Sequence, residues 1–322
     1  MKPTRLLAPV AIAAVALAAC NRKGGGTAAD GSASGPSGGG GGKPLVALVV
    51  KTLNNPYFID MQRGAEEAAN TGGVELIVQA AEREVDVERQ MQIVENLIQR
   101  HVGVLVITPS GSREIVPVIV KANQAGIPVI IVDTRADAAE LKSAGGRIAT
   151  FIGSDNYEGG RIAGQFMVER MKGVAKVAIL EGIPGHETGD ARLRGFRFAL
   201  EGHAGMQIVA SQPANWERDQ GFNVCQNMLQ AHPEVTALFA ASDLMALGAT
   251  EAIAAAGRTG KITVVGFDAL DEVRQAVKKG VMAGTVAQHP ARMGAVAVEW
   301  AVKILNGEVP PPEVAVPIEL VK

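Results

Sequence analysis

The chain of 322 residues has little net charge, few histidines and no dinucleotide-binding motif. Its 31 Lys and Arg nearly balance its 33 Asp and Glu, so no overall basic field is available to hold nucleic acid. The 5 histidines form no H-x-x-x-H pair and have no neighbouring cysteines, which argues against a metal site. No G-x-G-x-x-G motif is present, which argues against a nicotinamide-dependent dehydrogenase. We expect neither an enzyme nor a bound cofactor.

Cysteine is equally scarce, and the 2 cysteines predict different roles. Residues 6–19 form an apolar run after Lys2 and Arg5, which is typical of an export signal and shorter than the about 20 residues of a membrane span. The run ends Leu-Ala-Ala-Cys, which resembles the lipobox of bacterial lipoproteins and makes Cys20 the predicted lipid attachment site. Cys225 then has no partner for an internal disulfide, and its apolar helix face predicts a buried, unreactive thiol.

Residues 21–43 are rich in glycine and lack apolar periodicity. Because 10 of the 38 glycines lie here, this segment is predicted to be a flexible tether. We therefore predict a signal peptide at 1–20, a tether at 21–43, and an exported lipoprotein that faces the periplasm or the cell exterior. The membrane is expected to be contacted through the N-terminal lipid alone. The other 28 glycines are expected in tight turns between strands and helices.

From Pro44 onward, short β-rich apolar runs alternate with longer helical patterns. Continuous apolar strands separated by helices indicate parallel sheets covered on both faces, the doubly wound α/β architecture. About 279 residues with ten strands exceed one comfortable sheet, so two lobes are expected. The predicted strands are Leu45–Val50, Val74–Val78, Val102–Ile107, Pro128–Val132, Ala149–Ile152, Ala175–Leu180, Gln207–Ala210, Thr236–Ala240, Ile262–Gly266 and Gly284–Ala287.

Polar and aromatic residues follow many of these strands, where open parallel sheets bind their ligands. Asp133 and Asp268 can accept hydrogen bonds from paired hydroxyls, and Arg192 can donate to them. Tyr57 and Trp216, taken from only 2 Tyr and 2 Trp, can cover the apolar face of a sugar ring. This set of side chains favours the binding of a neutral, polyhydroxylated ligand.

The stretch from Leu45 to Lys322 resembles the type I periplasmic sugar-binding proteins of ABC importers, and within them the ribose-binding group. The matching segments are ALVVKTLNNPYF, AKVAILEGIPG, ASQPANWERDQGFNVCQNMLQAHPEV, ASDLMALGA, VVGFDAL and GTVAQHP. The resemblance implies two doubly wound lobes joined by a three-strand hinge, with the N-terminal lobe at 44–154 plus 289–316 and the C-terminal lobe at 155–288 plus 317–322. It also implies a monomer that closes around its ligand and delivers it to a permease.

Carried over by position, the resemblance implies a set of ligand contacts in each lobe. The first lobe contributes Asn55, Tyr57, Phe58, Thr108, Asp133 and Thr134, and the second contributes Arg192, Trp216, Ser242, Asp268 and Gln288.

Three of these positions depart from the ribose-binding pattern. The family has asparagine where this chain has Thr108 and Ser242, and arginine where it has Thr134. Shorter side chains leave more room and fewer donors, so a hexose, a cyclic polyol or another pentose form can fit. Arg135, one residue later, can replace the missing guanidinium if the loop shifts. Two neighbouring residues are given structural roles: Asp243 is expected to cap a helix at Leu244–Ala255, and Trp300 to pack inside a helix.

The expected function is therefore a substrate-binding lipoprotein of a bacterial ABC importer that captures a monosaccharide, either a ribose-like pentose or a hexose. One alternative is a binding protein for a cyclic polyol such as inositol, or for a sugar-like signal read by a chemoreceptor. A more remote alternative is a sugar-responsive transcription regulator. Such a regulator needs an N-terminal helix-turn-helix, where this chain has an apolar export signal and a tether.

Overall fold

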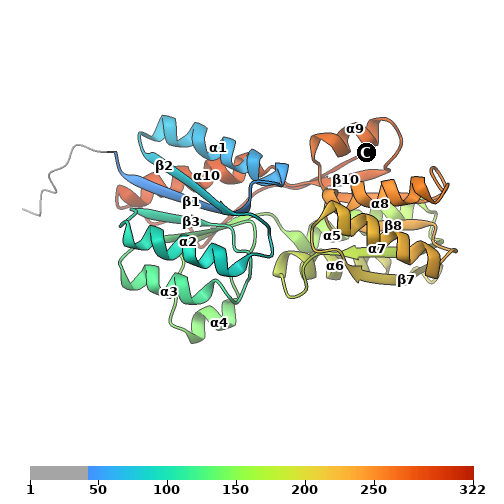
Figure 1. Cartoon of the computed structure of the whole chain (residues 1–322), viewed down its shortest axis with the longest axis horizontal. Helices are drawn as coiled ribbons and strands as arrows, with labels where there is room; N and C mark the ends of the chain where they lie inside the picture. Colours follow the sequence, from blue (N-terminus) through green and yellow to red (C-terminus); the bar gives the residue numbers. More distant parts are fainter. Residues whose placement is uncertain (1–42) are drawn as a thin grey trace, which may run out of the picture. The chain divides into compact units, whose positions relative to one another are not determined.

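The computed structural model describes residues 43–322, which form two parallel-sheet lobes of six strands each (Figure 1). The predicted signal peptide, Cys20 and all but the last residue of the predicted tether lie outside the described residues. The sheet of lobe 1 has the order β11-β5-β4-β3-β1-β2, and that of lobe 2 the order β12-β10-β9-β8-β6-β7. The two sheets therefore share one doubly wound topology, and the predicted fold class is confirmed.

All ten predicted strands form, with small shifts at their ends. Lobe 1 holds β1 (Leu45–Thr52), β2 (Glu75–Ala81), β3 (Val104–Ile107), β4 (Val129–Val132) and β5 (Thr150–Gly153). Lobe 2 holds β6 (Ala175–Glu181), β7 (Met206–Pro213), β8 (Ala237–Ala240), β9 (Thr263–Asp268) and β10 (Gly284–Ala287). The sequence did not predict β11 (Glu313–Ala315) and β12 (Glu319–Val321), which add a sixth strand to each sheet. β11 pairs parallel to β5, whereas β12 pairs antiparallel to β10.

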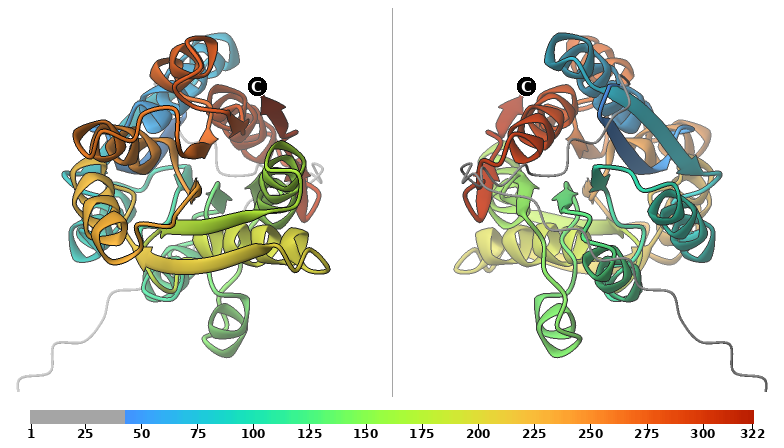
Figure 2. Two further views of the ribbon diagram at one scale, coloured as in Figure 1. Left: turned by 90° about the vertical axis from the view of Figure 1, so that its right-hand side faces the viewer. Right: turned by 90° about the vertical axis from the view of Figure 1, so that its left-hand side faces the viewer.

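Helices cover both faces of each sheet (Figure 2). The helices of lobe 1 are α1 (Pro56–Gly72), α2 (Val87–Gln99), α3 (Val116–Gln124), α4 (Ala138–Ser143) and α10 (Pro290–Leu305). The helices of lobe 2 are α5 (Asn156–Arg170), α6 (Glu187–Leu200), α7 (Arg218–Ala231), α8 (Asp243–Ala255) and α9 (Asp271–Lys278). No helix within residues 43–322 combines the length and the apolar character needed to cross a bilayer.

The apolar core of lobe 1 lies in two layers, because alternate residues of its strands point to opposite faces of the sheet and helices cover both faces. Val46, Leu48 and Val50 of β1 pack with α1 and α10, whereas Ala47 and Val49 pack with α2 and α3. All five are fully buried, because successive strand residues point to opposite faces and helices cover both. The carboxyl end of each sheet is therefore fixed by a core on both sides.

Ten glycines of the described residues lie in turns with positive φ, as predicted, whereas several others lie where two helices cross. A Cβ on Gly64 of α1 would lie 1.9 Å from the carbonyl oxygen of Ala291, and a Cβ on Gly294 of α10 would lie 2.0 Å from that of Met61. In lobe 2, Gly160 of α5 makes the same kind of contact with the Arg192 carbonyl of α6, at 2.0 Å. These helix pairs therefore pack backbone to backbone, which a larger residue would prevent.

We predict that replacing Gly294 by alanine destabilises the protein. In an ordinary helix this change stabilises by roughly 0.5–1 kcal/mol, but here the added methyl group meets the Met61 carbonyl, and overpacking of this kind costs about 1–3 kcal/mol. Urea unfolding of the variant is the measurement. Asn70→Ala, at an exposed position of α1, is the control and should keep or slightly raise the midpoint. A raised midpoint for Gly294→Ala would contradict the close helix contact.

Candidate functional site

A cavity at the carboxyl ends of the parallel strands is lined by residues from both lobes. Nine of the eleven predicted ligand-contact residues line it: Asn55, Tyr57, Phe58, Asp133, Arg192, Trp216, Ser242, Asp268 and Gln288. Lys51, Glu84 and Thr188 also line it and were not predicted as site residues.

The turn before α1 fixes two aromatic rings at the cavity. Asn55 caps the helix, because its side-chain oxygen accepts a hydrogen bond from the Tyr57 N–H at 3.0 Å, and Pro56 occupies the first helical position. Tyr57 and Phe58 therefore both lie in the first turn of α1, and their rings meet edge to face with centroids 5.2 Å apart. Both rings are almost fully buried, which gives lobe 1 an apolar surface at the site.

Asp133 is held at the end of β4 by two hydroxyl groups. The Tyr57 hydroxyl donates to one carboxylate oxygen at 2.8 Å, and the Thr134 hydroxyl donates to the other at 3.0 Å. The backbone of Asp133 has φ 63°, in the left-handed region that residues other than glycine rarely adopt. Burial, followed by the charge of Asp133, raises the pKa of Tyr57, so the phenol keeps its proton and acts as donor. Each carboxylate oxygen retains capacity for a further hydrogen bond.

Two predicted contacts, Thr108 and Thr134, do not line the cavity. The Thr108 hydroxyl is buried and points to the sulfur of Met61, at 3.5 Å. The Thr134 hydroxyl, besides holding Asp133, accepts a hydrogen bond from Thr188 of lobe 2 at 3.1 Å. Both hydroxyls have partners within the protein, and direct ligand contact by Thr108 and Thr134 stays a prediction.

Arg135 does not supply the missing guanidinium. Its Nη2 atom lies 2.6 Å from an oxygen of Glu313 on β11, and its guanidinium carbon lies 3.7 Å from the centre of the Phe151 ring. The side chain is thus directed to the edge of the sheet, and the hypothesis that Arg135 replaces the family arginine is wrong.

A buried ion pair stands at the cavity wall of lobe 1. Lys51, at the end of β1, is 3% exposed, and its Nζ lies 3.7 Å from Glu84, which follows β2. Glu84 also accepts a hydrogen bond from the Asn55 amide at 2.9 Å. Burial raises the pKa of Glu84, while the charge of Lys51 opposes that rise. Lys51 could have been predicted as a site residue, because it is a cation at the end of an apolar strand. Glu84 lies beyond the predicted end of its strand and carried no such signal.

Arg192 of α6 organises the lobe 2 side of the cavity. Its Nη1 donates to the Ala241 carbonyl at 2.6 Å, and its Nε donates to Asn156 at 2.9 Å. Nη1 also lies 3.5 Å from Asp268, and the guanidinium carbon lies 3.8 Å from the centre of the Phe267 ring. The cation is 3% exposed, so these partners replace water around it.

Asp268 and Gln288 form a second polar pair beside Arg192. The Gln288 amide donates to Asp268 at 2.7 Å. Burial raises the pKa of Asp268 to about 7, and the charge of Arg192 acts against this rise. The Gln288 Oε1 atom and the Ser242 hydroxyl are buried without a hydrogen-bond partner within residues 43–322. Because buried polar atoms are nearly always paired, these two atoms indicate where a ligand would bond.

The indole ring of Trp216 lies close to the backbone of Gly182, which explains the glycine after β6. A Cβ on Gly182 would lie 1.9 Å from the indole ring. Trp216 itself has φ 67° and is 5% exposed. The ring therefore forms an apolar surface on the lobe 2 side of the cavity, whereas Tyr57 and Phe58 form one on the lobe 1 side.

The other residues with predicted roles gave mixed outcomes. Asp243 does not cap α8. Its side chain is fully buried, and its carboxylate accepts hydrogen bonds from the Leu270 N–H at 2.8 Å and from the Thr285 hydroxyl at 2.7 Å. Trp300 packs against the lobe 1 core, as predicted. Cys225 is buried, and burial raises the pKa of its thiol to about 12, which confirms the unreactive role.

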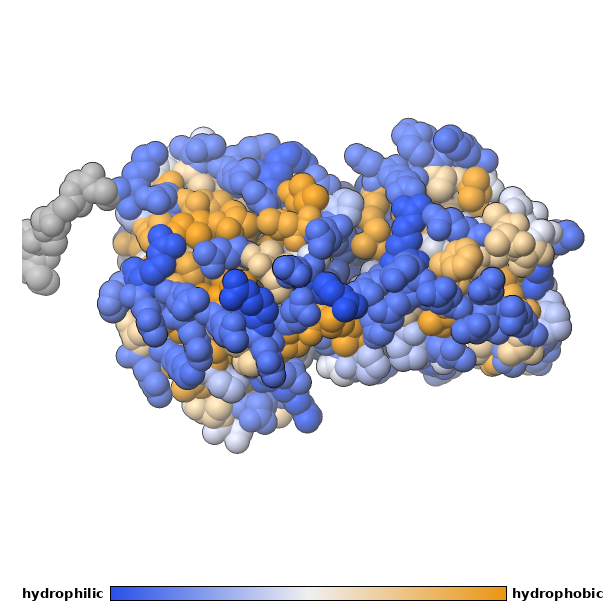
Figure 3. All heavy atoms as spheres, in the orientation of Figure 1, coloured by the Kyte–Doolittle hydropathy of each residue, from blue (hydrophilic) through white to orange (hydrophobic). Residues whose placement is uncertain are grey.

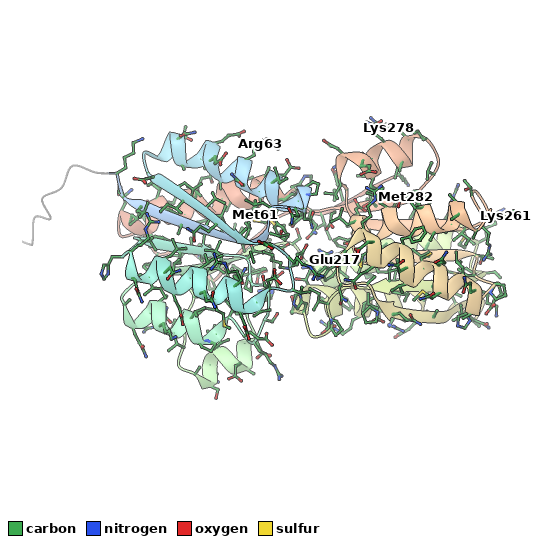
Figure 4. The ribbon with its side chains drawn as sticks, viewed as in Figure 1. Met61, Arg63, Glu217, Lys261, Lys278 and Met282 are labelled. Atoms are coloured by element: carbon green, nitrogen blue, oxygen red, sulfur yellow. The ribbon has the colours of Figure 1, made fainter. Side chains whose placement is uncertain are left out.

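The two lobes touch each other around the cavity. Arg83 of lobe 1 donates to Glu217 of lobe 2 through Nη2 at 2.7 Å and Nε at 3.0 Å. Glu217 is at the boundary between the lobes in Figure 4, and Figure 3 shows hydrophilic side chains along that boundary. No group of three or more His, Cys, Asp or Glu side chains in the described part of the chain is placed to hold a metal ion. The arrangement can thus hold hydroxyl groups between carboxylates and cations while aromatic rings cover apolar faces.

Comparison with known proteins gives a consistent result. Residues 46–309 match the family model described as periplasmic binding protein domain. The chain is 38% identical to a D-ribose/D-allose-binding protein of Pseudomonas aeruginosa, over 87% of this chain and 89% of that protein. It is 40% identical to the ribose import binding protein of Escherichia coli, over 83% of this chain and 86% of that protein. A solute-binding protein of Actinobacillus succinogenes with bound D-allose superposes with TM-score 0.82 and 40% identity, covering 87% of this chain and 97% of that structure.

We predict that the titration of Asp268 lowers the free energy of unfolding as the pH rises. Its pKa is about 7 in the folded chain and about 4 when unfolded, so between these values the folded chain holds a proton that the unfolded chain has lost. Because folding must then take up a proton, the free energy of unfolding falls as the pH rises toward about 7 and levels off once the folded chain has also lost the proton. Replacement by asparagine removes this titration. The stability of Asp268→Asn relative to the wild type should therefore increase by roughly 2–3 kcal/mol from pH 5 to pH 8.

Urea unfolding at several pH values checks this prediction. Asp271→Asn, an exposed position at the start of α9, serves as the control and should follow the wild type across the range. Parallel stability curves for Asp268→Asn and the wild type would show that Asp268 does not carry the buried proton.

Proposed function

The chain belongs to the periplasmic binding protein family, and we propose that it is the substrate-binding protein of a bacterial ABC importer whose ligand is a monosaccharide. The observation that carries this proposal is the cavity lined by residues of both lobes at the carboxyl ends of the strands. Its wall combines aromatic surfaces with Asp133, Asp268 and Arg192, and it leaves the buried Gln288 Oε1 and Ser242 hydroxyl without partners. A sugar supplies both the hydroxyl groups and the apolar ring face that such a wall needs. Its role is to bind and release, without a chemical reaction.

We favour a hexose of the allose type over a pentose. Thr108 and Thr134 do not line the cavity, and Lys51 and Glu84 add a charged pair to its wall on the lobe 1 side. The hydroxymethyl group of a hexopyranose offers one more hydroxyl to such a pair. Several relatives support this choice, because their names or bound ligands include D-allose. Inositol is less favoured, since the structure with bound myo-inositol is more distant, at 30% identity.

We propose that the chain crosses between the lobes near 154–155, 288–289 and 316–317, so that the lobes comprise 44–154 plus 289–316 and 155–288 plus 317–322. Two crossings are tied together, because the Ser154 hydroxyl donates to the Val316 carbonyl at 3.1 Å and the Val316 N–H donates to the Gly153 carbonyl at 2.9 Å. Bending there separates the lobes without breaking either core. A ligand that contacts both lobes favours the closed form, which the permease would recognise.

The remaining proposals concern attachment and partners. The family places the protein outside the cytoplasmic membrane, in the periplasm. We propose that a lipid on Cys20 anchors it to the membrane, with the glycine-rich segment 21–43 as tether, and that the protein acts as a monomer. A chemoreceptor is a second proposed partner beside the permease. An unmodified N-terminus in native material, measured by mass spectrometry, would refute the anchor.

Titration calorimetry with D-allose, D-ribose, D-glucose and myo-inositol tests the ligand and the site. We expect D-allose to bind most tightly, with micromolar or better affinity, because each charge-assisted hydrogen bond contributes about 1.5–3 kcal/mol before association costs. Replacing both Asp133 and Asp268 by alanine should weaken binding by at least about 100-fold. The proposed function fails if none of these sugars binds, and the site assignment fails if the double variant binds as well as the wild type.

The contact between Arg83 and Glu217 should slow ligand release. Because it joins the two lobes beside the cavity, opening must break it, whereas its exposed position limits its strength. We expect Arg83→Ala to raise the dissociation rate about two- to fivefold in stopped-flow experiments. The increase should be smaller at high salt, because salt screens the ion pair of the wild type. Arg63→Ala removes a comparable exposed ion pair within α1 of lobe 1 and should leave the rate unchanged (Figure 4). Equal effects of the two substitutions would rule out a role in closure.

A further inference from the structure

The start of α6 in lobe 2 contacts lobe 1 at two points. The Thr188 hydroxyl donates a hydrogen bond to the Thr134 hydroxyl, which follows β4, at 3.1 Å. The Glu187 N–H, one residue earlier, faces the Ser112 hydroxyl in the loop after β3, in a longer contact of 3.5 Å. The residue before the helix, His186, makes no side-chain cap to α6. Lobe 1 therefore supplies partners to the first turn of a lobe 2 helix.

The hydroxyl groups of Thr188 and Thr134 form a chain of hydrogen bonds with one direction, which ends on Asp133. Thr134 donates to a carboxylate oxygen of Asp133 at 3.0 Å. A carboxylate can only accept, and a hydroxyl has a single proton, so the Thr134 proton must point to Asp133. Its oxygen then accepts the proton of Thr188. The only proton of the Thr188 hydroxyl is thus directed to the other lobe.

This chain is shielded from water and reaches the wall of the cavity. Thr134 is 0% exposed and Thr188 is 3% exposed, and Thr188 lines the cavity together with Asp133. A hydroxyl oxygen that accepts a hydrogen bond is polarised, which strengthens the bond that the same hydroxyl donates. The contact between the lobes therefore strengthens the hydrogen bond from Thr134 to Asp133, a residue that we propose to bind the ligand.

Thr188 is fixed to the body of lobe 2. It lies four residues before Arg192, so both side chains occupy the same face of α6, and both line the cavity. Arg192 is held by the Ala241 carbonyl and by the side chain of Asn156, both in lobe 2. When the lobes separate, Thr188 must move with lobe 2 and lose its contact with Thr134.

We propose that Thr188 is a positioning residue: when the lobes close, its hydroxyl donates to Thr134 and so fixes the Thr134 proton on Asp133. Closure itself then orients the carboxylate that receives hydroxyl groups of the ligand, and opening releases this carboxylate. This inference rests on the proposed function, because it assigns a role within the same binding site. The ion pair of Arg83 with Glu217 also joins the lobes, but it is exposed and has no contact with the Asp133 carboxylate.

Thr188→Val tests the proposal, because valine has nearly the same shape and no hydroxyl. Stopped-flow fluorescence of Trp216, which lines the cavity, gives the two rate constants with D-allose, or with the tightest-binding of the four sugars if that is another. We expect dissociation to become about fivefold faster, the effect of one neutral hydrogen bond. Association should not change, because the bond forms only after the ligand has entered the open form.

Two further variants serve as controls. Thr188→Ser keeps the hydroxyl and should stay within about twofold of the wild type. Thr71→Val makes the same change at an exposed position of α1 and should leave both rate constants unchanged. An unchanged dissociation rate in Thr188→Val, or a slower association with no effect on dissociation, overturns the proposal. Failure of all four sugars to bind the wild type refutes the proposed function itself.

A double-mutant cycle with Thr134→Val separates positioning from direct contact of Thr188 with the ligand. If Thr188 acts through Thr134, then Thr188→Val should change the dissociation rate by less than about twofold once Thr134 is already valine. The same fivefold effect in both backgrounds overturns the proposal, because the Thr188 hydroxyl then acts without Thr134.

A spectroscopic measurement applies even if Thr134→Val abolishes binding. Carbon-13 nuclear magnetic resonance can follow the carboxyl carbon of Asp133, assigned by its loss in Asp133→Asn, in protein saturated with the sugar. We expect this resonance to move in Thr188→Val and to stay in place in Thr71→Val. A resonance at the wild-type position in Thr188→Val overturns the proposal.

Discussion

The buried guanidinium of Arg192 is the constraint on which lobe 2 depends. A cation that is 3% exposed persists only if fixed partners replace its hydration, and the chain supplies them from the end of β8, the start of α5 and the end of β9. The same demand fixes Asp268 in the cavity wall. The position of Arg192 depends in turn on Gly160, whose missing side chain lets α5 approach the Arg192 carbonyl. A helix crossing within the core thereby determines the geometry of the ligand site.

The cavity concentrates features that weaken the fold and prepare it for a ligand. Asp133, Trp216 and Asp268 have positive φ angles, and burial raises the pKa values of Glu84 and Asp268. Such strained and poorly solvated groups persist because two well-packed sheets hold them. Hydroxyl groups of a ligand can satisfy the unpaired acceptors and solvate the carboxylates, so part of the binding energy offsets a cost already present in the empty protein. A sequence selected for stability alone would replace several of these residues.

Local pattern and strand-end logic predicted most of the fold and much of the cavity wall. The ten predicted strands are long and apolar enough to stand out, whereas β11 and β12 have three residues each and carry exposed glutamates. Residues directly after strands were found because parallel strands place them together. Burial of Lys51 with Glu84 could not be predicted, since it depends on two segments meeting in space. Packing between helices depends on the same kind of long-range contact, so the places of Gly64, Gly160 and Gly294 at helix crossings were not predicted either.

The placement of α10 and β11 has a consequence for when the protein can fold. Lobe 1 begins with β1, yet α10 packs on α1 and β11 completes the sheet beside β5. This lobe is therefore built from segments that lie far apart in the sequence. Contacts between such distant segments form slowly, because a long loop must first close. A nascent chain therefore cannot complete the sheet of lobe 1 until β11, at Glu313–Ala315, has been made.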